Sequence, residues 1–229
     1  MGYLDGKYNG VKLLSKSDAP CRLISGAEAP ERSGGIHVSD VIRRIAIALG
    51  YLKDDRDDAD EAESREEWEA SLPREAMLAM ASGLAWEEYL ARVYEGQVEF
   101  HPGEVEKDGI SGSPDGVKWG YRNWGDPTIV AEFKYSEKSS NNEPIGPDGK
   151  PTPKWWMWLT QVMCYCHMLD TTRADFYVYH VRGDYRDQRK QFLKYEFEFT
   201  EAELEGNWKM IVREARAMEK EKKEAEETE

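Results

Sequence analysis

Hydrophobic and polar residues follow patterns along this chain that predict a series of helices and strands. Apolar runs and alternations bounded by turn residues predict short strands at about 97–101, 109–112, 116–121, 128–135, 174–181 and 192–199. Helical periodicity predicts helices at about 39–51, from Pro73 to about 95, over 155–169 and from Glu201 onward. Residues 1–20 are expected to form a hairpin around Asn9 and Gly10. This order predicts an α/β fold, a central mixed β-sheet flanked by helices.

Length and composition fit one domain spanning residues 1–229. A chain of 229 residues with 40% hydrophobic content can bury one substantial core. Within it we expect an acidic linker at about 53–67, a long turn-rich loop over 136–153 and a charged C-terminal helix at about 201–229. Loops of that length are usually functional or disordered.

The long loop ends in a cluster of lysines and tryptophans that could contact nucleic acid. Lys150 and Lys154 lie close in sequence to Trp155 and Trp156, and Lys138 lies earlier in the loop. Phosphate contact by lysine together with base stacking on an aromatic ring is a known way to hold a single strand. However, the helix at 155–169 is almost wholly apolar, which favours a core position for at least two of its three tryptophans.

The net charge of −14 is the main objection to nucleic-acid binding, but it is unevenly distributed. Residues 54–69 carry a net −8 and residues 196–229 a net −6, so the rest of the chain is balanced. Between Lys118 and Lys194 there are twelve Lys and Arg against nine Asp and Glu. A locally basic groove is therefore compatible with an acidic envelope.

The most informative motif is a turn followed by a strand. Asp115 lies in a Ser-Pro-Asp-Gly turn, and the strand 129–134 then carries Glu132 and Lys134. Residues two apart on a strand point to one face, so these two project together while Phe133 points into the core. Two carboxylates and an amine suit Mg²⁺, a phosphodiester and its attacking water. The alternative is a surface hairpin with an ordinary exposed ion pair.

Asp, followed by Glu-x-Lys, resembles the signature of the PD-(D/E)XK nuclease superfamily. The Ser-Pro-Asp-Gly form is similar to the branch of phage lambda exonuclease and YqaJ-type viral recombination nucleases, which are RecB-like. This resemblance implies a restriction-endonuclease-like core. It also implies a Mg²⁺-dependent site, with Mn²⁺ as a substitute, in which Asp115, Glu132 and Lys134 are catalytic and the carbonyl of Phe133 is a further metal ligand.

The same resemblance assigns three helical residues. An earlier helix carries Gly-x-x-x-Glu in these families, which matches Gly83 and Glu87 and implies that Glu87 reaches the metal. Gly83 is expected to let the helix approach the sheet closely. A later helix carries Gln-x-x-x-Tyr, matched by Gln161 and Tyr165, which share one face. Gln161 is expected to be catalytic and Tyr165 to contact DNA, although core packing explains Tyr165 equally well.

A third motif concerns the end of the DNA strand. The lambda-type enzymes hold a terminal 5′-phosphate with an Arg and a Ser at the start of an early helix, which match Arg32 and Ser39. A helix N-terminus with these side chains is a sound anion site. The alternative is a helix capped by Ser39 or Asp40 beside a loop arginine. Arg43 and Arg44 are further candidates without a matching motif.

Together these observations predict a Mg²⁺-dependent deoxyribonuclease, a phage-type 5′→3′ exonuclease acting on linear double-stranded DNA in recombination. The alternatives are a structure-specific or RecB-like endonuclease and a non-catalytic adaptor that keeps the fold. The resemblance leaves room for a homo-oligomer and for a single-strand annealing protein as a partner. Cys21, Cys164 and Cys166 are too few for the four-cysteine iron–sulfur cluster of some relatives. We expect a cytoplasmic protein, because no signal peptide or membrane span is evident.

Overall fold

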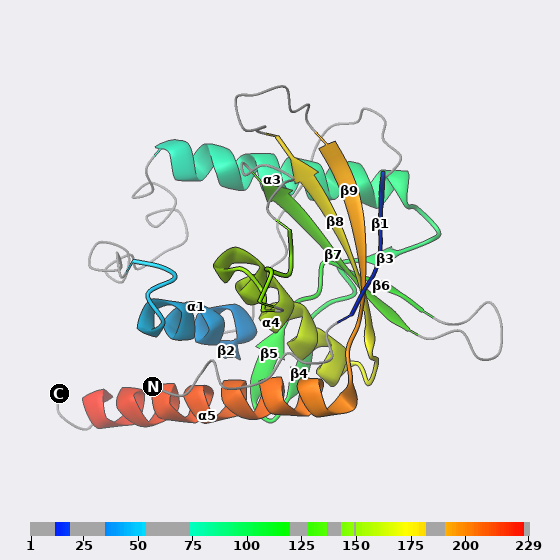
Figure 1. Cartoon of the computed structure of the whole chain (residues 1–229). Coiled ribbons are helices and arrows are strands. Elements are labelled where there is room, and N and C mark those ends of the chain that lie inside the picture. The colour runs from blue at the N-terminus through cyan, green and yellow to red at the C-terminus, as the bar shows by residue number, and fades with distance from the viewer. Residues whose placement is uncertain are drawn as a thin grey trace.

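The computed structural model describes residues 12–18, 35–53, 74–119, 128–136, 143–148, 150–181 and 191–226. Its helices are α1 (Val38–Ala48), α3 (Arg74–Val93), α4 (Pro153–Met168) and α5 (Glu201–Glu226). Its strands are β1 (Lys12–Asp18), β2 (Ile36–His37), β3 (Glu99–Phe100), β4 (Val105–Lys107), β5 (Ile110–Gly112), β6 (Gly116–Lys118), β7 (Ile129–Ser136), β8 (Arg173–His180) and β9 (Gln191–Glu198). Figure 1 shows their arrangement.

A six-stranded sheet in the order β1-β9-β8-β7-β6-β3 forms the centre of the fold. The central pair, β7 and β8, is parallel, and every other pair in this sheet is antiparallel. A parallel pair needs a crossover connection, and α4 lies between β7 and β8 in the sequence. The mixed, helix-flanked α/β sheet predicted from the sequence is therefore confirmed.

Helices cover both faces of this sheet (Figure 1). One face packs against α1, α4 and α5 in a core that includes Val130 of β7 and Phe176 of β8. The other face packs against α3 through Ala131, Phe133 and Tyr177. Successive residues of a strand face opposite sides, so β7 divides its side chains between the two cores.

Local sequence explains where two of the helices begin. Pro153 is the first residue of α4, a position where its missing N–H costs nothing. At the start of α5, the Thr200 hydroxyl accepts a hydrogen bond from the Glu203 N–H, while the Glu203 carboxylate accepts one from the Thr200 N–H. This is a capping box, and it confirms the helix predicted to start at Glu201.

A second sheet, in the order β2-β5-β4, was missing from the sequence prediction except for β5. β2 and β4 are only two and three residues long, too short for a periodic pattern to identify. β2 pairs in parallel with β5, with Ile36 opposite Ile110 and His37 opposite Ser111. This pairing places the start of α1 beside the strand that leads to Asp115.

Two sequence predictions about α1 and α3 are wrong. The N-cap of α1 is His37, so Ser39 and Asp40 lie within its first turn and do not cap it. Gly83 does not serve a close approach of α3 to the sheet, because an added Cβ would meet no heavy atom within 4 Å.

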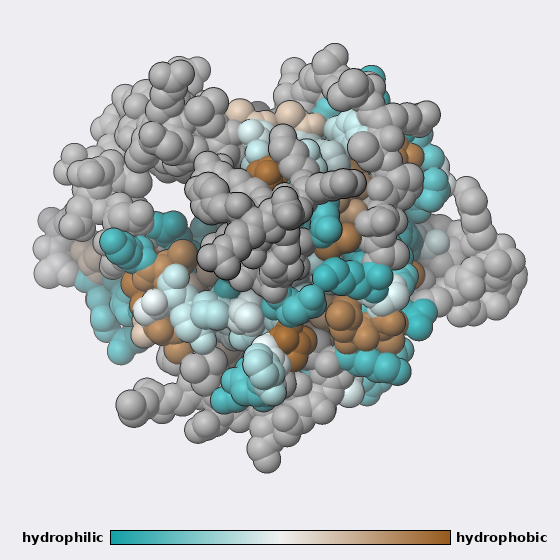
Figure 2. Space-filling model, turned by 45° about the horizontal axis from the view of Figure 1, so that its top comes forward, coloured by the Kyte–Doolittle hydropathy of each residue, from teal (hydrophilic) through white to brown (hydrophobic). Residues whose placement is uncertain are grey.

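Outside the described residues lie the Asn9–Gly10 turn of the predicted hairpin, the acidic linker after Lys53 and residues 120–127. Of the long loop, residues 143–148 and 150–152 are described, and Ile145 forms an isolated bridge with Pro151. The face in Figure 2 mixes small groups of hydrophobic and hydrophilic residues. None of the described helices is both long enough and apolar enough to cross a membrane.

Candidate active site

The turn between β5 and β6 brings Asp115 beside β7. The Asp115 carboxylate accepts a hydrogen bond of 2.8 Å from the Phe133 N–H, and the Asp115 carbonyl accepts one of 3.0 Å from the His101 N–H. The pairing of β6 with β7 ends at Gly116 opposite Ala131. Just beyond this point, the Asp115 side chain accepts the hydrogen bond from the β7 backbone. This confirms the expectation that the turn folds back against the strand.

Two glycines fix the position of this turn from opposite sides. A Cβ on Gly112 would lie 2.7 Å from Cε1 of Tyr165, and one on Gly116 would lie 2.6 Å from Cγ1 of Val98. Both distances are shorter than real Cβ contacts, so any side chain at either position would displace its neighbour. The sequence predicts a turn at this point but carries no local signal for the packing role of these two glycines.

Glu132 projects from β7 into the side of the sheet covered by α4. Its side chain is fully buried, and one carboxylate oxygen accepts a hydrogen bond from Nζ of Lys134. The other oxygen, Oε2, has no hydrogen-bond partner among the described residues. A buried carboxylate oxygen without a partner is costly, which indicates that another group satisfies it in the working protein.

Lys134 connects the two acidic residues. Its ammonium forms ion pairs with Glu132 and with Asp115, the latter at 3.8 Å. Burial by itself lowers the pKa of Lys134, but the charges of Glu132 and Asp115 outweigh it and hold the pKa above its ordinary value. Phe133 points to the opposite face and stacks with Phe100 at 4.9 Å. The predicted alternation along β7 is therefore confirmed.

Glu87 of α3 belongs to the same electrostatic cluster. Burial raises its pKa to about 8, with a further contribution from the charge of Asp115 and an opposing one from Lys134. The pKa of Glu132 is also raised to about 8, again first by burial and then by Asp115. The next residue, Glu88, instead forms an ion pair with Arg92 at 2.8 Å. We call Glu87, Asp115, Glu132 and Lys134 the acidic cluster.

α4 adds Gln161 and Tyr165 to one side of the acidic cluster. The Gln161 amide donates a 2.8 Å hydrogen bond to the Tyr165 hydroxyl, so the two predicted positions do share one face. Burial raises the pKa of Tyr165, and the negative charges of Glu132 and Asp115 raise it further. Tyr165 is buried, with its hydroxyl bonded to Gln161.

The residues assigned to a terminal phosphate are only partly described. Ser39 lies in the first turn of α1, next to the β2–β5 pair that leads into the Asp115 turn. Arg32 lies outside the described residues. Arg44 bridges to Glu214 and Glu221 of α5, which gives it a structural role between the two helices.

The donor set around the acidic cluster fits a hard divalent cation. Glu132 offers an oxygen without a partner, and Asp115 and Glu87 add carboxylates of the type that Mg²⁺ prefers. The backbone N–H and C=O of one residue in a strand point to the same side of the strand. Because the Phe133 N–H points to the Asp115 carboxylate, the Phe133 carbonyl also points to the side on which Asp115 lies. Within the described ranges, no ready-made group of three or more His, Cys, Asp or Glu ligands was found. In this structure the Lys134 ammonium lies between the carboxylates instead.

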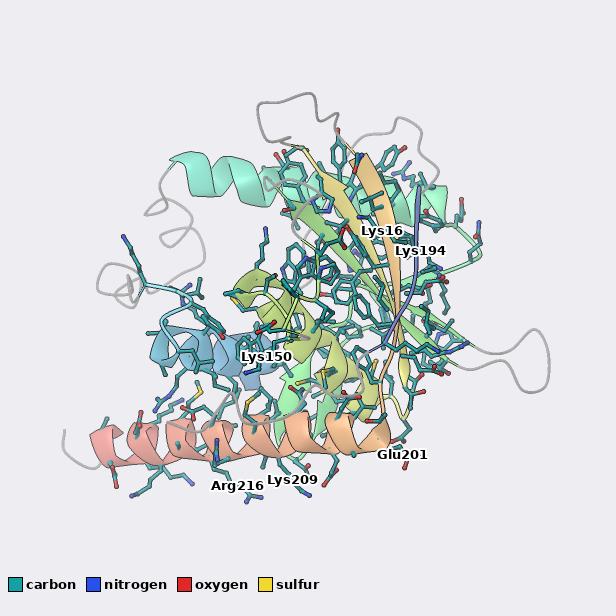
Figure 3. The ribbon with its side chains drawn as sticks, in the orientation of Figure 1. Lys16, Lys150, Lys194, Glu201, Lys209 and Arg216 are labelled. Atoms are coloured by element: carbon teal, nitrogen blue, oxygen red, sulfur yellow. The ribbon has the colours of Figure 1, made fainter. Side chains whose placement is uncertain are left out.

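A second ionic group lies on the opposite face of the main sheet. Asp175 of β8 is 3% exposed, accepts a hydrogen bond from Lys118 and forms an ion pair with Lys194 at 3.1 Å. Lys194 lies on β9 next to β1, which carries Lys16 (Figure 3). Asp175 is opposite Ala131 on β7, so this group faces α3 and is separated from Glu132 by the sheet. Two lysines compensate its buried carboxylate, which is a structural arrangement.

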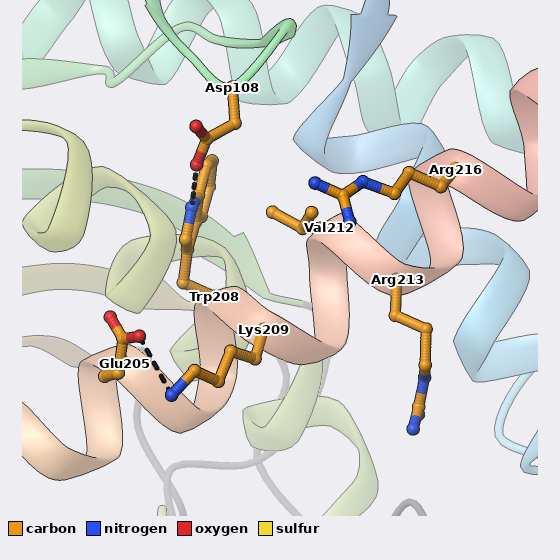
Figure 4. A pocket seen from close by; sticks show the side chains of 7 residues that line it. All are labelled: Asp108, Glu205, Trp208, Lys209, Val212, Arg213 and Arg216. Atoms are coloured by element: carbon orange, nitrogen blue, oxygen red, sulfur yellow. Dashed lines mark hydrogen bonds and ion pairs between the residues drawn. The ribbon is translucent and has the colours of Figure 1, made fainter.

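A pocket of about 460 Å³ lies against α5 (Figure 4). It is lined by Asp108, Glu205, Trp208, Lys209, Val212, Arg213 and Arg216. Trp208 donates a 2.8 Å hydrogen bond to Asp108, and Lys209 pairs with Glu205 at 3.0 Å. The pocket shares no residue with the acidic cluster, so we place the candidate active site at the cluster.

No family model and no curated protein matches this sequence. Solved structures do match. The alkaline exonuclease LHK-Exo from Laribacter hongkongensis is 22% identical, with 86% of this chain and 95% of that chain covered and a TM-score of 0.44. Its complex with dAMP gives 18% identity, the same coverage and a TM-score of 0.47. A phage-related exonuclease from Haemophilus somnus is 15% identical, with coverage of 77% and 78% and a TM-score of 0.37. At this similarity, function has to be argued from the chain's own residues.

Proposed function

We propose that this protein is a divalent-metal-dependent nuclease of the PD-(D/E)XK type that hydrolyses phosphodiester bonds in DNA. The observation that carries this proposal is the convergence of Asp115, Glu132 and Lys134 at one end of the β6–β7 ladder. A chain without this activity has no physical reason to bury Glu132 beside two other carboxyl groups. That argues against a non-catalytic adaptor with the same fold.

Asp115, Glu132, Glu87 and the Phe133 carbonyl would hold Mg²⁺ or Mn²⁺. When bound, the ion would polarise the scissile phosphate and lower the pKa of a water molecule. The buried Oε2 of Glu132 would gain the partner that it lacks among the described residues. The hydrogen bond from the Phe133 N–H would hold the Asp115 carboxylate in a fixed orientation.

Lys134 would act as a hydrogen-bond donor and as a positive charge. Its raised pKa keeps the ammonium protonated near neutral pH, which favours orienting the water and offsetting charge on the phosphoryl oxygens over removing a proton. In the hydrolysis, the water oxygen forms a bond to phosphorus and loses a proton, the bond from phosphorus to the leaving oxygen breaks, and that oxygen takes up a proton, so that one water molecule is consumed with no net change in protons. Gln161 and Tyr165 would position the phosphate on the α4 side of the acidic cluster.

We further propose that the enzyme is a phage-type 5′→3′ exonuclease in recombination. This finer proposal is supported by the similarity of the Arg32 and Ser39 motif to the terminal-phosphate pocket of lambda-type enzymes. Ser39 lies at the end of α1 that is adjacent to β5, and β5 runs into the Asp115 turn.

The direct test is digestion of linear duplex DNA by the wild type and by Lys134→Ala, with Mg²⁺ or with EDTA. Lys134 acts on charge that develops in the transition state, so the variant should lose ~10²-fold or more in kcat while DNA affinity changes little. Lys222→Ala, at an exposed lysine on α5, is the matched control and should digest DNA like the wild type. Undiminished cleavage by Lys134→Ala, or full activity in EDTA, would refute the proposed function.

A further inference from the structure

α4 carries a line of polar and aromatic side chains that extends past Gln161 and Tyr165. Lys154, Trp158, Gln161 and Tyr165 are spaced by four, three and four residues, which places them on one face of the helix. Gln161 and Tyr165 belong to the candidate active site. Lys154 and Trp158, which lie nearer the start of α4, have no role in the proposed mechanism.

β7 carries a matching line on the same side of the sheet. Glu132, Lys134 and Ser136 alternate along the strand and so project toward α4. The two lines meet where the Lys154 ammonium donates a 3.1 Å hydrogen bond to the Ser136 hydroxyl. Ser136 is two residues beyond Lys134, a step of about 7 Å along the strand. The Lys154 ammonium therefore lies beside the next side chain of β7 on this face after Glu132 and Lys134.

Its surroundings hold Lys154 in place. The ammonium lies 4.6 Å from the centre of the Trp158 ring, and Trp158 packs edge-on against the buried Trp155 at 5.0 Å. Ser136 is 1% exposed, whereas Lys154 and Trp158 are half-buried and reach the surface. The ring and the hydroxyl therefore hold the ammonium at a defined position on this surface.

The charge around this position is favourable for a phosphate. The first turn of α4 contains no acidic residue, and the N-terminal end of a helix contributes partial positive charge. Trp155 and Trp156 are buried in the core, as the sequence predicted for at least two of the tryptophans, so Trp158 is the aromatic residue that reaches this surface.

We propose that Lys154, positioned by Trp158 and Ser136, binds the phosphodiester next to the scissile one. This inference rests on the proposed function, because it takes the scissile phosphate to lie at the acidic cluster. Neighbouring phosphates of an extended strand are separated by a distance comparable to the step from Lys134 to Ser136. The ligand is thus the backbone of a nucleic-acid strand, without regard to base sequence.

The test uses single-turnover cleavage of oligonucleotides in which one linkage beside the scissile bond is a neutral methylphosphonate. In the wild type, this change should raise the half-saturating concentration ~10-fold, because a charge-assisted hydrogen bond is lost. Lys154→Met should show the same ~10-fold increase on unmodified DNA, with kcat within about twofold, and no further increase on the methylphosphonate. In this variant, the slope of the logarithm of the DNA-binding constant against the logarithm of the salt concentration should be smaller in magnitude by about one.

Lys154→Arg should retain most of the affinity, and Lys222→Met, the matched control at an exposed lysine on α5, should respond to the methylphosphonate like the wild type. Sensitivity of Lys154→Met equal to that of the wild type would overturn the inference. So would a wild type indifferent to methylphosphonate at either neighbouring linkage. If the wild type cleaves no DNA, the proposed function fails. Anisotropy measurements of binding by the same oligonucleotides then still decide whether Lys154 contacts a phosphate.

Discussion

Glu132 shows at the scale of a single residue what burial does to a carboxyl group. The side chain is inaccessible to solvent, and one of its oxygens has no hydrogen-bond partner among the described residues. Its pKa and that of Glu87 are raised because each loses solvation and each lies near Asp115. Such an arrangement costs stability and is expected where a cation compensates the charge.

These pKa shifts predict opposite effects of pH with and without metal. The folded chain holds protons on Glu87 and Glu132 that the unfolded chain releases near the ordinary pKa of 4.5. The stability of the metal-free protein should therefore fall as pH rises from there to about 8. Metal ions bind the deprotonated carboxylates, so the stabilisation by Mg²⁺ should grow across the same range.

Melting temperatures at pH 5.5 and 8.5, with Mg²⁺ or EDTA, measure both effects. At a concentration one hundred times its Kd, the ion should stabilise the wild type by about 2.7 kcal/mol. Glu132→Gln and Asp115→Asn keep the shape and remove the charge, so both should reduce this stabilisation, and Glu132→Gln should flatten the pH dependence. Glu88→Gln, one position along α3 from Glu87, is the control. Wild-type Mg²⁺ stabilisation in both acidic variants would place the metal elsewhere.

At the scale of elements, the turn that presents Asp115 depends on the fit between β5 and α4. Gly112→Ala would place a Cβ 2.7 Å from the Tyr165 ring, which is itself buried and hydrogen-bonded to Gln161. We expect a loss of about 1–3 kcal/mol in stability, as for other overpacked positions. Activity should also drop, because the shift moves the Asp115 turn.

Gly83→Ala on α3 is the matched control for this substitution. The added methyl group meets open space, and alanine is a better helix former than glycine, so stability should rise by about 0.5–1 kcal/mol. Chemical denaturation and cleavage assays on the two variants separate the effects. Equal stability of Gly112→Ala and the wild type would show that α4 does not fix this turn.

The longer elements could be predicted from the sequence, and the shorter ones could not. The strand around 128–135 and the helix around 155–169 differ from β7 and α4 by only one or two residues at each end. Their apolar patterns are long, and more than half of their residues are buried. β2 and β4 are stabilised by pairing with β5, a tertiary contact without a local signal. The same pairing explains why the predicted N-cap of α1 is wrong. His37 is the last residue of β2, and α1 begins directly after it.

The candidate site could be predicted where two residues share a local element. Glu132 and Lys134 on β7, and Gln161 and Tyr165 on α4, follow from the periods of a strand and a helix. The contact between Lys154 and Ser136 joins two elements across the long loop, so neither local pattern contains it. The spacing of Lys154 and Trp158 ahead of Gln161 was the available signal.

At the scale of the whole molecule, the net negative charge is concentrated in two segments of the sequence that contain no residue of the acidic cluster. Residues 54–69 and 196–229 account for the net charge of −14, and the segment from Lys118 to Lys194 has an excess of basic residues. That segment contains β7, α4 and β8, which build the side of the acidic cluster discussed here. An overall acidic chain is thus consistent with a surface that binds a polyanion at one place.

Whether the whole molecule acts as an exonuclease or as an endonuclease depends on how it holds the end of the DNA strand. The start of α1 lies beside β5, so a phosphate bound by Ser39, the helix N-terminus and Arg32 would be connected to the Asp115 turn through the β2–β5 pair. A processive 5′ exonuclease must hold the terminal phosphate on which it advances. A phosphate dianion next to an arginine forms strong charge-assisted hydrogen bonds.

Arg32→Ala should therefore slow digestion of 5′-phosphorylated ends much more than digestion of 5′-hydroxyl ends, by ~10-fold or more. Its Mg²⁺-induced rise in melting temperature should equal that of the wild type, because no carboxylate of the acidic cluster is altered. Arg44→Ala, which breaks the link between α1 and α5, controls for effects on α1 alone. If the wild type has no preference for a 5′-phosphate, or nicks closed circular DNA as fast as it degrades linear DNA, the exonuclease proposal fails. The acidic cluster would then serve an endonuclease, since its chemistry is the same for an internal phosphodiester.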